Sequence, residues 1–139
     1  MTKARDYLEQ ISWMKSELAA LAAQREALMT QVAGVGAIRY DKDKVQTSPD
    51  NTFESSIIRA LEKRKPIDSR IDYLRREIKK RTGQIRTMGG KTGAVLYCRY
   101  VDGLTWRTIC HRMGIKYRAA IILHNRGLIR FEQRFLREM

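Results

Sequence analysis

Residues 105–122 read TWRTICHRMGIKYRAAII, and this stretch decides the fold of the C-terminal part of the chain. Its first half places four apolar or thiol side chains at positions i, i+3, i+4 and i+7 of one helix face: Trp106, Ile109, Cys110 and Met113. Thr105 is a natural cap for the start of that helix. Gly114 follows the last periodic residue, where a left-handed backbone is needed. The stretch therefore predicts two helices joined by a short turn.

The neighbouring sequence adds a helix on the N-terminal side. We expect three helices, at about Thr92–Val101, Thr105–Met113 and Tyr117–Arg137, and we assign residues 91–139 to one module. A trihelical unit with a three-residue turn that contains glycine is typical of the helix-turn-helix, whose last helix enters the major groove of DNA. One side of that last helix should be buried: Tyr117, Ala120, Leu123, His124, Gly127, Leu128, Phe131 and Phe135.

Residues 1–90 carry two long apolar stripes at alternating three- and four-residue steps. The first predicts a helix from about Lys3 to Val32, ended by Gly34 and Gly36, and only Arg25 interrupts its stripe. The second runs from Phe53 to Met88, is interrupted by Arg64 and Arg81, and contains Pro66, where we expect a kink. Because one amphipathic helix cannot bury its own stripe, the two should form a long antiparallel, coiled-coil-like hairpin for oligomerisation or partner binding. The predicted fold class is all-α.

The charge is large and uneven. The chain holds 28 Lys and Arg against 15 Asp and Glu, a net charge of +13. Residues 1–32 are balanced, with four of each sign, whereas residues 91–139 hold ten basic and three acidic side chains. Such asymmetry indicates a polyanionic partner, most often nucleic acid.

Cysteine and histidine do not form a recognisable metal or catalytic pattern. Cys98, Cys110, His111 and His124 lack any CxxC or HxxxH pair. Cys110 belongs to the apolar face, and His111 lies about 100° away around the helix, so the two cannot easily hold one ion. The GGKT sequence at 89–92 is no phosphate loop, because the required earlier glycine is Ile85. We therefore expect no metal, no cofactor and no enzymatic activity.

The remaining features indicate a cytosolic protein. The first residues, MTKARDYLEQ, are amphipathic and lack the apolar core of a secretion signal. Apolar runs stay well below the roughly 20 residues that span a bilayer, so we expect no membrane partner.

The candidate DNA contacts follow from the helix-turn-helix geometry. The exposed side of the last helix and the start of the middle helix supply them: Lys116, Tyr117, Arg118, Ala119, Ile122, Asn125, Arg126, Thr105 and Arg107. Arginine and lysine suit phosphates and guanine edges, and asparagine suits adenine.

Two stretches also carry a family resemblance. They are YDKDKVQTSPDNT at 40–52 and RYVDGLTWRTICHRMG at 99–114, the latter followed by LHNRGL at 123–128. With them the chain resembles phage late-gene transcriptional regulators of the ArpU/RinA type, from phages of Gram-positive bacteria. The second stretch is also similar to the helix-turn-helix of region four of bacterial sigma factors. The resemblance implies promoter-proximal DNA binding that activates packaging and morphogenesis genes. We expect a homodimer because one small module rarely gives enough affinity alone, and we expect the helical hairpin to set the oligomeric state or to meet host RNA polymerase.

One departure from that family keeps two alternatives open. RAAIILHNRG places Ala119, Ile121 and Ile122 around the exposed face of the last helix, where the family usually has polar or basic residues. Apolar side chains can touch thymine methyl groups, but they can also form a protein interface. The alternatives are an RNA-polymerase-binding protein without base readout, and a DNA-packaging component resembling a terminase small subunit.

Overall fold

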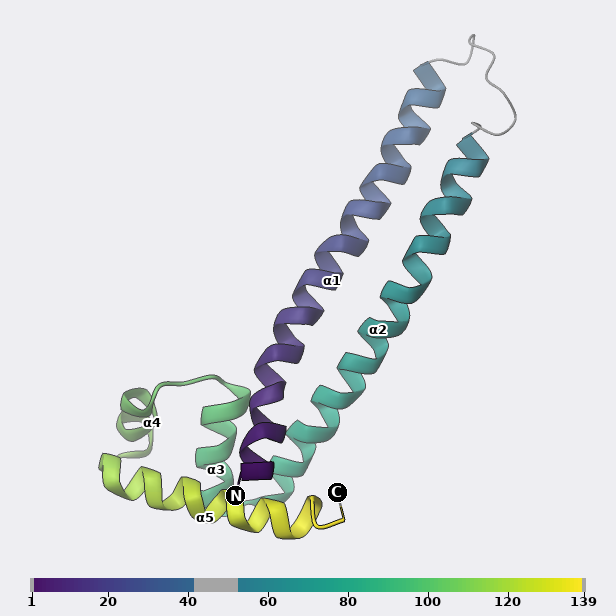
Figure 1. Cartoon of the computed structure of the whole chain (residues 1–139). Coiled ribbons are helices and arrows are strands. Elements are labelled where there is room, and N and C mark those ends of the chain that lie inside the picture. The colour runs from purple at the N-terminus through teal and green to yellow at the C-terminus, as the bar shows by residue number, and fades with distance from the viewer. Residues whose placement is uncertain (1, 42–52, 139) are drawn as a thin grey trace. The chain divides into compact units, whose positions relative to one another are not determined.

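The computed structural model describes residues 2–41 and 53–138, and these are all-helical, as predicted. Two long helices, α1 (Thr2–Asp41) and α2 (Phe53–Met88), precede three shorter ones (Figure 1). These are α3 (Gly90–Leu96), α4 (Trp106–Met113) and α5 (Tyr117–Phe135), and a π-helical turn, η2 (Tyr97–Val101), continues α3. When η2 is counted as the end of α3, the bounds of the three shorter helices lie within two residues of the predicted ones.

The first helix is longer than predicted. We expected Gly34 and Gly36 to end it, but α1 continues to Asp41. A glycine inside a helix costs only about 1 kcal/mol relative to alanine, which does not end a helix whose neighbouring residues favour it. Most of the 40–52 stretch lies outside the described residues.

Pro66 does not break the second helix. The structure assigns a single helix from Phe53 to Met88 with the proline in its interior. Proline removes one backbone donor from the helix and crowds the preceding turn. The side chain of Pro66 is exposed, so it can be accommodated without displacing the buried stripe.

Residues 17–75 form one compact unit, an antiparallel hairpin of α1 and α2. Arg25 and Arg64, which interrupt the two apolar stripes, both bond the carboxylate of Asp68, at 3.4 and 3.0 Å. Farther along, the guanidinium of Arg70 donates two hydrogen bonds to Glu17, at 2.7 and 3.0 Å. The charges that break the stripes are therefore paired across or along the hairpin.

Residues 1–16 and 76–139 form the other compact unit, here called the C-terminal unit. Its core joins the first turns of α1 to the last helices: Ala4, Tyr7, Leu8, Ile11, Ile85, Leu96, Tyr100, Leu128, Phe131 and Leu136. The predicted boundary between residues 90 and 91 therefore does not separate the two units. The start of the chain is part of the core that supports α5.

Arg81, near the end of α2, forms hydrogen bonds with the first turns of α1. It is buried, and its Nη1 donates hydrogen bonds to the Tyr7 carbonyl and to Gln10 Oε1, both at 2.7 Å. Its Nη2 bonds Glu77 at 3.1 Å, and its guanidinium lies 4.0 Å from the centre of the Tyr7 ring. This arginine was predicted only as a break in a stripe, and the structure makes it a cross-link within the C-terminal unit.

A glycine lets α5 approach α3 closely. A Cβ atom built on Gly127 would lie 3.1 Å from Leu96 Cγ and 3.3 Å from the Thr92 carbonyl oxygen. Ala120, about two turns earlier, is fully buried. Both small residues belong to the side of α5 that was predicted to be buried, and both are buried.

Candidate nucleic-acid interface

The middle helix of the trihelical module has well-defined ends. Thr105 is its N-cap, with an extended backbone and a hydroxyl that accepts a hydrogen bond from the Thr108 N–H at 3.2 Å. At the other end Gly114 adopts a left-handed conformation (φ 65°, ψ 37°), and the Ile115 N–H bonds the Cys110 carbonyl at 3.0 Å. Both ends are as the sequence predicted. The turn after Gly114 then directs the chain into α5.

Aromatic packing holds α4 against α5. The Trp106 ring meets the His124 ring edge-on at 4.9 Å between centres, and the Tyr117 ring edge-on at 6.5 Å. The guanidinium of Arg99 lies 4.8 Å from the centre of the Trp106 ring and donates a hydrogen bond to the Leu104 carbonyl at 3.0 Å. Trp106 of α4 thus contacts both the π-helical turn and α5, and these contacts hold α4 against α5.

Five of the eight residues predicted on the buried side of α5 are buried: Ala120, His124, Gly127, Leu128 and Phe131. Leu123 and Phe135 are half-buried. Tyr117 is 61% exposed, because it lies at the first turn, where only the edge of Trp106 covers it.

The predicted contact residues divide into an exposed set and a half-buried pair. Seven are exposed: Thr105, Arg107, Lys116, Tyr117, Arg118, Ile122 and Arg126. Ala119 and Asn125 are half-buried, and Asn125 Oδ1 is 3.3 Å from His124 Nδ1. The exposed face of α5, defined here by Arg118, Ile122, Arg126 and Ile129, is therefore basic with an apolar centre.

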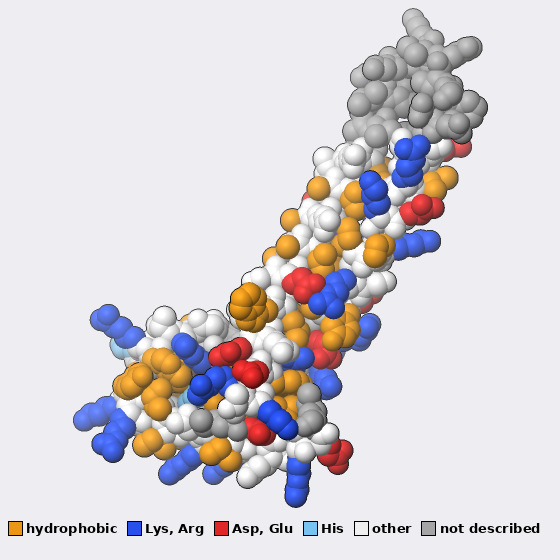
Figure 2. Space-filling model, in the orientation of Figure 1, with side chains coloured by type: hydrophobic (Ala, Val, Ile, Leu, Met, Phe, Trp, Pro, Cys, Tyr) orange, Lys and Arg blue, Asp and Glu red, His pale blue; other side chains and the backbone are white. Residues whose placement is uncertain are grey.

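One apolar residue expected around that face differs from the expectation. Ile121 is half-buried and lines a pocket together with His124 and Asn125. The apolar residues of the exposed face are Ile122, which is 44% exposed, and Ile129, which is 45% exposed. Figure 2 shows Lys and Arg side chains projecting around the helices of the C-terminal unit, with apolar side chains among them.

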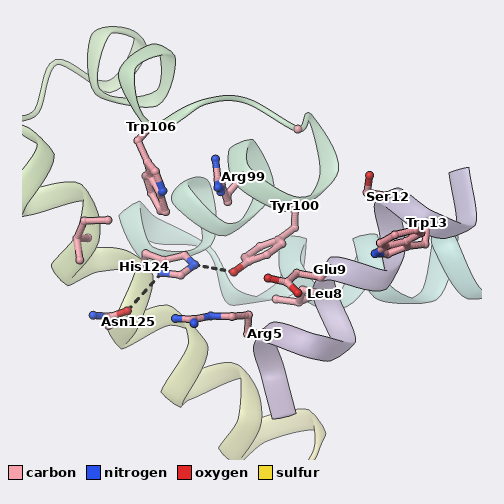
Figure 3. A pocket seen from close by; sticks show the side chains of 12 residues that line it. Arg5, Leu8, Glu9, Ser12, Trp13, Arg99, Tyr100, Trp106, His124 and Asn125 are labelled. Atoms are coloured by element: carbon pink, nitrogen blue, oxygen red, sulfur yellow. Dashed lines mark hydrogen bonds between the residues drawn. The ribbon is translucent and has the colours of Figure 1, made fainter. Parts of the chain in front are cut away.

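Behind this face lies a buried hydrogen-bonded pair. His124 Nε2 is 2.7 Å from the Tyr100 hydroxyl, and the two rings are stacked, with 5.6 Å between their centres (Figure 3). Burial lowers the pKa of His124, and the nearby guanidinium groups of Arg5 and Arg99 lower it further, against the hydrogen bond with Asn125. Burial also raises the pKa of the Tyr100 hydroxyl. Near neutral pH the imidazole is therefore neutral, and the tautomer with a proton on Nδ1 accepts from the Tyr100 hydroxyl.

The cysteines and histidines have separate environments. Cys98 is buried and Cys110 half-buried, and both carry free thiols. His111 is exposed on α4, and His124 is buried on α5. Over residues 2–41 and 53–138, no three metal-ligating side chains come together. The interpretation of Cys110 as part of the inner face of α4 agrees with its burial.

Sequence reasoning missed the residues that α1 brings to this module. Arg5 and Glu9 lie beside Tyr100 and His124 in the structure, and Trp13 lines the same pocket, although about 90 residues or more separate the two groups in sequence (Figure 3). The local pattern of α1 marks these residues only as its polar side. No spacing in the sequence shows which distant helix that side meets.

Comparisons with known proteins assign no family to this chain. No helix within the described ranges has the length and apolar character of a membrane span. Searches against protein-family models, curated proteins and solved structures found no match to this chain.

Proposed function

We propose that this chain is a sequence-specific transcriptional regulator that binds double-stranded DNA through α5. The observation that carries the proposal is the exposed face of α5, which follows a capped helix and a left-handed glycine turn. In the helix-turn-helix arrangement the helix after such a turn lies in the major groove. The opposite side of α5 is buried against the core of the C-terminal unit, so a single face is available for a partner.

The charge of the module supports a DNA partner. Residues 91–139 hold ten basic and three acidic side chains, and Arg107, Arg118 and Arg126 are exposed on α4 and α5. Neutralising phosphates with such side chains supplies much of the affinity of DNA-binding proteins. Arg118 and Arg126 are suited to phosphates or guanine, and Ile122 to the methyl group of thymine.

The rest of the proposal depends on the family resemblance and on affinity. The stretches at 40–52 and 99–114 are the reason to propose a phage regulator that activates late genes in the cytoplasm of a bacterial host. A single small module buries only about 600–1,000 Å² on DNA, so we propose that two copies bind together. Host RNA polymerase is the proposed second partner.

Binding to RNA polymerase without DNA readout is the alternative that a specific observation favours. Ile122 and Ile129 form an exposed apolar centre on the proposed DNA face. Such a centre also suits a protein interface. Capture of purified polymerase by a chain that shows no salt-dependent affinity for DNA would support this alternative.

The test is a salt series of binding measurements on DNA that spans the late-promoter region of the source phage. We expect Arg118→Ala and Arg126→Ala each to weaken binding and to reduce the slope of log K against log salt by roughly 0.9 for each phosphate that is no longer neutralised. Arg75→Ala removes the same charge from an exposed position of α2 and serves as the control. Unchanged affinity and slope in both α5 variants would rule out this placement of the DNA.

Specificity and assembly are tested with the same protein. Competitor DNA without the promoter should leave most of the complex between the protein and promoter DNA intact. If the competitor abolishes that complex completely, the binding is not sequence-specific. Mass measurement of the free and bound protein should give two copies. A ring of eight or more subunits would instead indicate a packaging component.

A further inference from the structure

A pocket of about 750 Å³ lies in the C-terminal unit, on the flank of α5 away from its exposed face. Three stretches line it: residues 5–13 of α1, residues 99–106, and residues 121–125 of α5 (Figure 3). We call it the His124 pocket. All its walls belong to one compact unit, so its geometry is a property of that unit alone.

The charged groups of the His124 pocket leave one net positive charge. Arg5 and Arg99 line it with Glu9, while His124 is neutral near pH 7. Both guanidinium groups are close enough to His124 to lower its pKa. Arg99 is held in place by the Leu104 carbonyl and by the Trp106 ring, whereas Arg5 is exposed and reaches into the pocket from α1. A ligand with a single negative charge would balance these groups.

The uncharged walls of the pocket include three aromatic side chains and the His124 imidazole. Trp106 and Tyr100 line it beside His124, and Trp13, which is 75% exposed, stands at the side formed by α1. Leu8 and Ile121 complete the apolar surface. Rings prefer flat partners in offset-stacked or edge-on geometry, and a guanidinium pairs with a carboxylate through two parallel hydrogen bonds.

We propose that the His124 pocket binds a small planar monocarboxylate. The guanidinium groups of Arg5 and Arg99 hold the carboxylate, and the ring of Trp106 contacts the flat body. Glu9 disfavours a second negative charge on the ligand, which separates this class from phosphate dianions.

The position of the pocket gives the ligand a regulatory role, and this part rests on the proposed function. Ile121 and Asn125 line the pocket. The next residue in sequence after each of them, Ile122 and Arg126 respectively, belongs to the exposed face of α5. A ligand between α1 and α5 can therefore change the affinity for DNA if it binds more tightly to the protein in one orientation of α5 than in another.

Intrinsic reporters make the ligand test direct. Trp13 and Trp106 are the only two tryptophans of the chain, and both line the pocket. Their indole N–H signals in a ¹H–¹⁵N spectrum are assigned with Trp13→Phe and followed during titration with benzoate, without DNA. We expect saturable shifts with benzoate, and much weaker ones with benzamide, which lacks the charge, and with inorganic phosphate, which lacks the ring.

Two variants of opposite sign test the assignment of the charges. Arg5→Gln should weaken benzoate binding by about tenfold or more, since hydrogen bonds to charged groups contribute that much. Glu9→Gln should tighten it, and Lys79→Gln, an exposed position of α2 outside the pocket, should leave it unchanged. Arg5→Gln and Glu9→Gln are both at exposed positions, and unchanged thermal unfolding will show that they remain folded.

Several results would overturn the proposal. They are no benzoate shift into the millimolar range, equal shifts with benzamide or phosphate, or an Arg5→Gln variant that binds benzoate as the parent does. DNA binding is measured separately, with and without benzoate. A chain that binds benzoate but not DNA would contradict the proposed function and leave the pocket assignment intact, and the reverse result would do the opposite.

Discussion

Replacing Gly127 with alanine tests how closely α5 must approach α3. The new Cβ would lie 3.1 and 3.2 Å from Leu96 Cγ and Cδ1, and 3.3 Å from the Thr92 carbonyl oxygen. Leu96 is fully buried and the carbonyl belongs to the backbone, so neither can move away freely. Overpacking of this kind costs roughly 1–3 kcal/mol. Alanine regains up to about 1 kcal/mol of helix propensity. We therefore expect Gly127→Ala to lower the free energy of unfolding by about 0–2 kcal/mol.

Gly83 provides the matched control for that substitution. It lies inside α2, and a Cβ built on it meets nothing within 4 Å. Gly83→Ala should therefore stabilise the chain by about 0.5–1 kcal/mol through helix propensity alone. In urea unfolding followed by circular dichroism, the two variants should differ by about 1–3 kcal/mol. If Gly127→Ala stabilises the chain as much as Gly83→Ala does, the close contact between α3 and α5 is wrong.

Three further predictions concern the ends of α4 and the buried histidine. Gly114→Ala should cost roughly 1–2 kcal/mol, because its φ of 65° is strained for alanine, and an unchanged urea midpoint would contradict the left-handed turn. Thr105→Ala should cost about 1 kcal/mol and Thr105→Ser much less, and equal losses would argue against the cap. His124 has a pKa below its ordinary 6.5, so the unfolded chain takes up its proton first, and the free energy of unfolding should fall as pH drops below about 6.5. His124→Gln should make this fall smaller, and the same pH profile in the variant and the parent would show that another group is responsible.

Local features of the sequence predicted the helices well. The three- and four-residue spacing located α1 and α2, and Thr105 and Gly114 marked both ends of α4, because caps and turns depend on neighbouring residues alone. The predicted end of α1 was wrong. A glycine weakens a helix by a small amount, and the residues after Gly36 extend it to Asp41.

Contacts between distant segments could not be predicted in the same way. A stripe shows that a helix is buried on one side, but not which partner covers it, so residues 4–11 were assigned to the hairpin and not to the core beneath α5. The three arginines in the stripes looked like interruptions. Their partners, Asp68 for two of them and the Tyr7 carbonyl for Arg81, are visible only once the helices are paired.

The exposed face of α5 was predicted for most of its members. Helical spacing located Arg118, Ile122 and Arg126 there, and the structure exposes all three. Asn125 and Ile121 lie at the edge of that face, where a small rotation decides between solvent and the pocket behind. Spacing alone does not resolve such positions, because the residues that cover them come from α1.

The origin of the C-terminal core from both ends of the chain also orders its folding in time. Tyr7 and its partner Gln84 are 77 residues apart, and Phe131, which packs on the same tyrosine ring, is made last of the three. During synthesis the apolar side of the first turns of α1 therefore stays exposed to solvent until α5 has been made. Contacts between residues so far apart in sequence also form slowly. A nascent or truncated chain that lacks α5 has no Leu128 or Phe131 to complete this core, and a fragment of residues 91–139 has no Tyr7, Leu8 or Ile11. The core of the unit that carries the exposed face of α5 therefore needs both the first turns of α1 and α5 on the same chain.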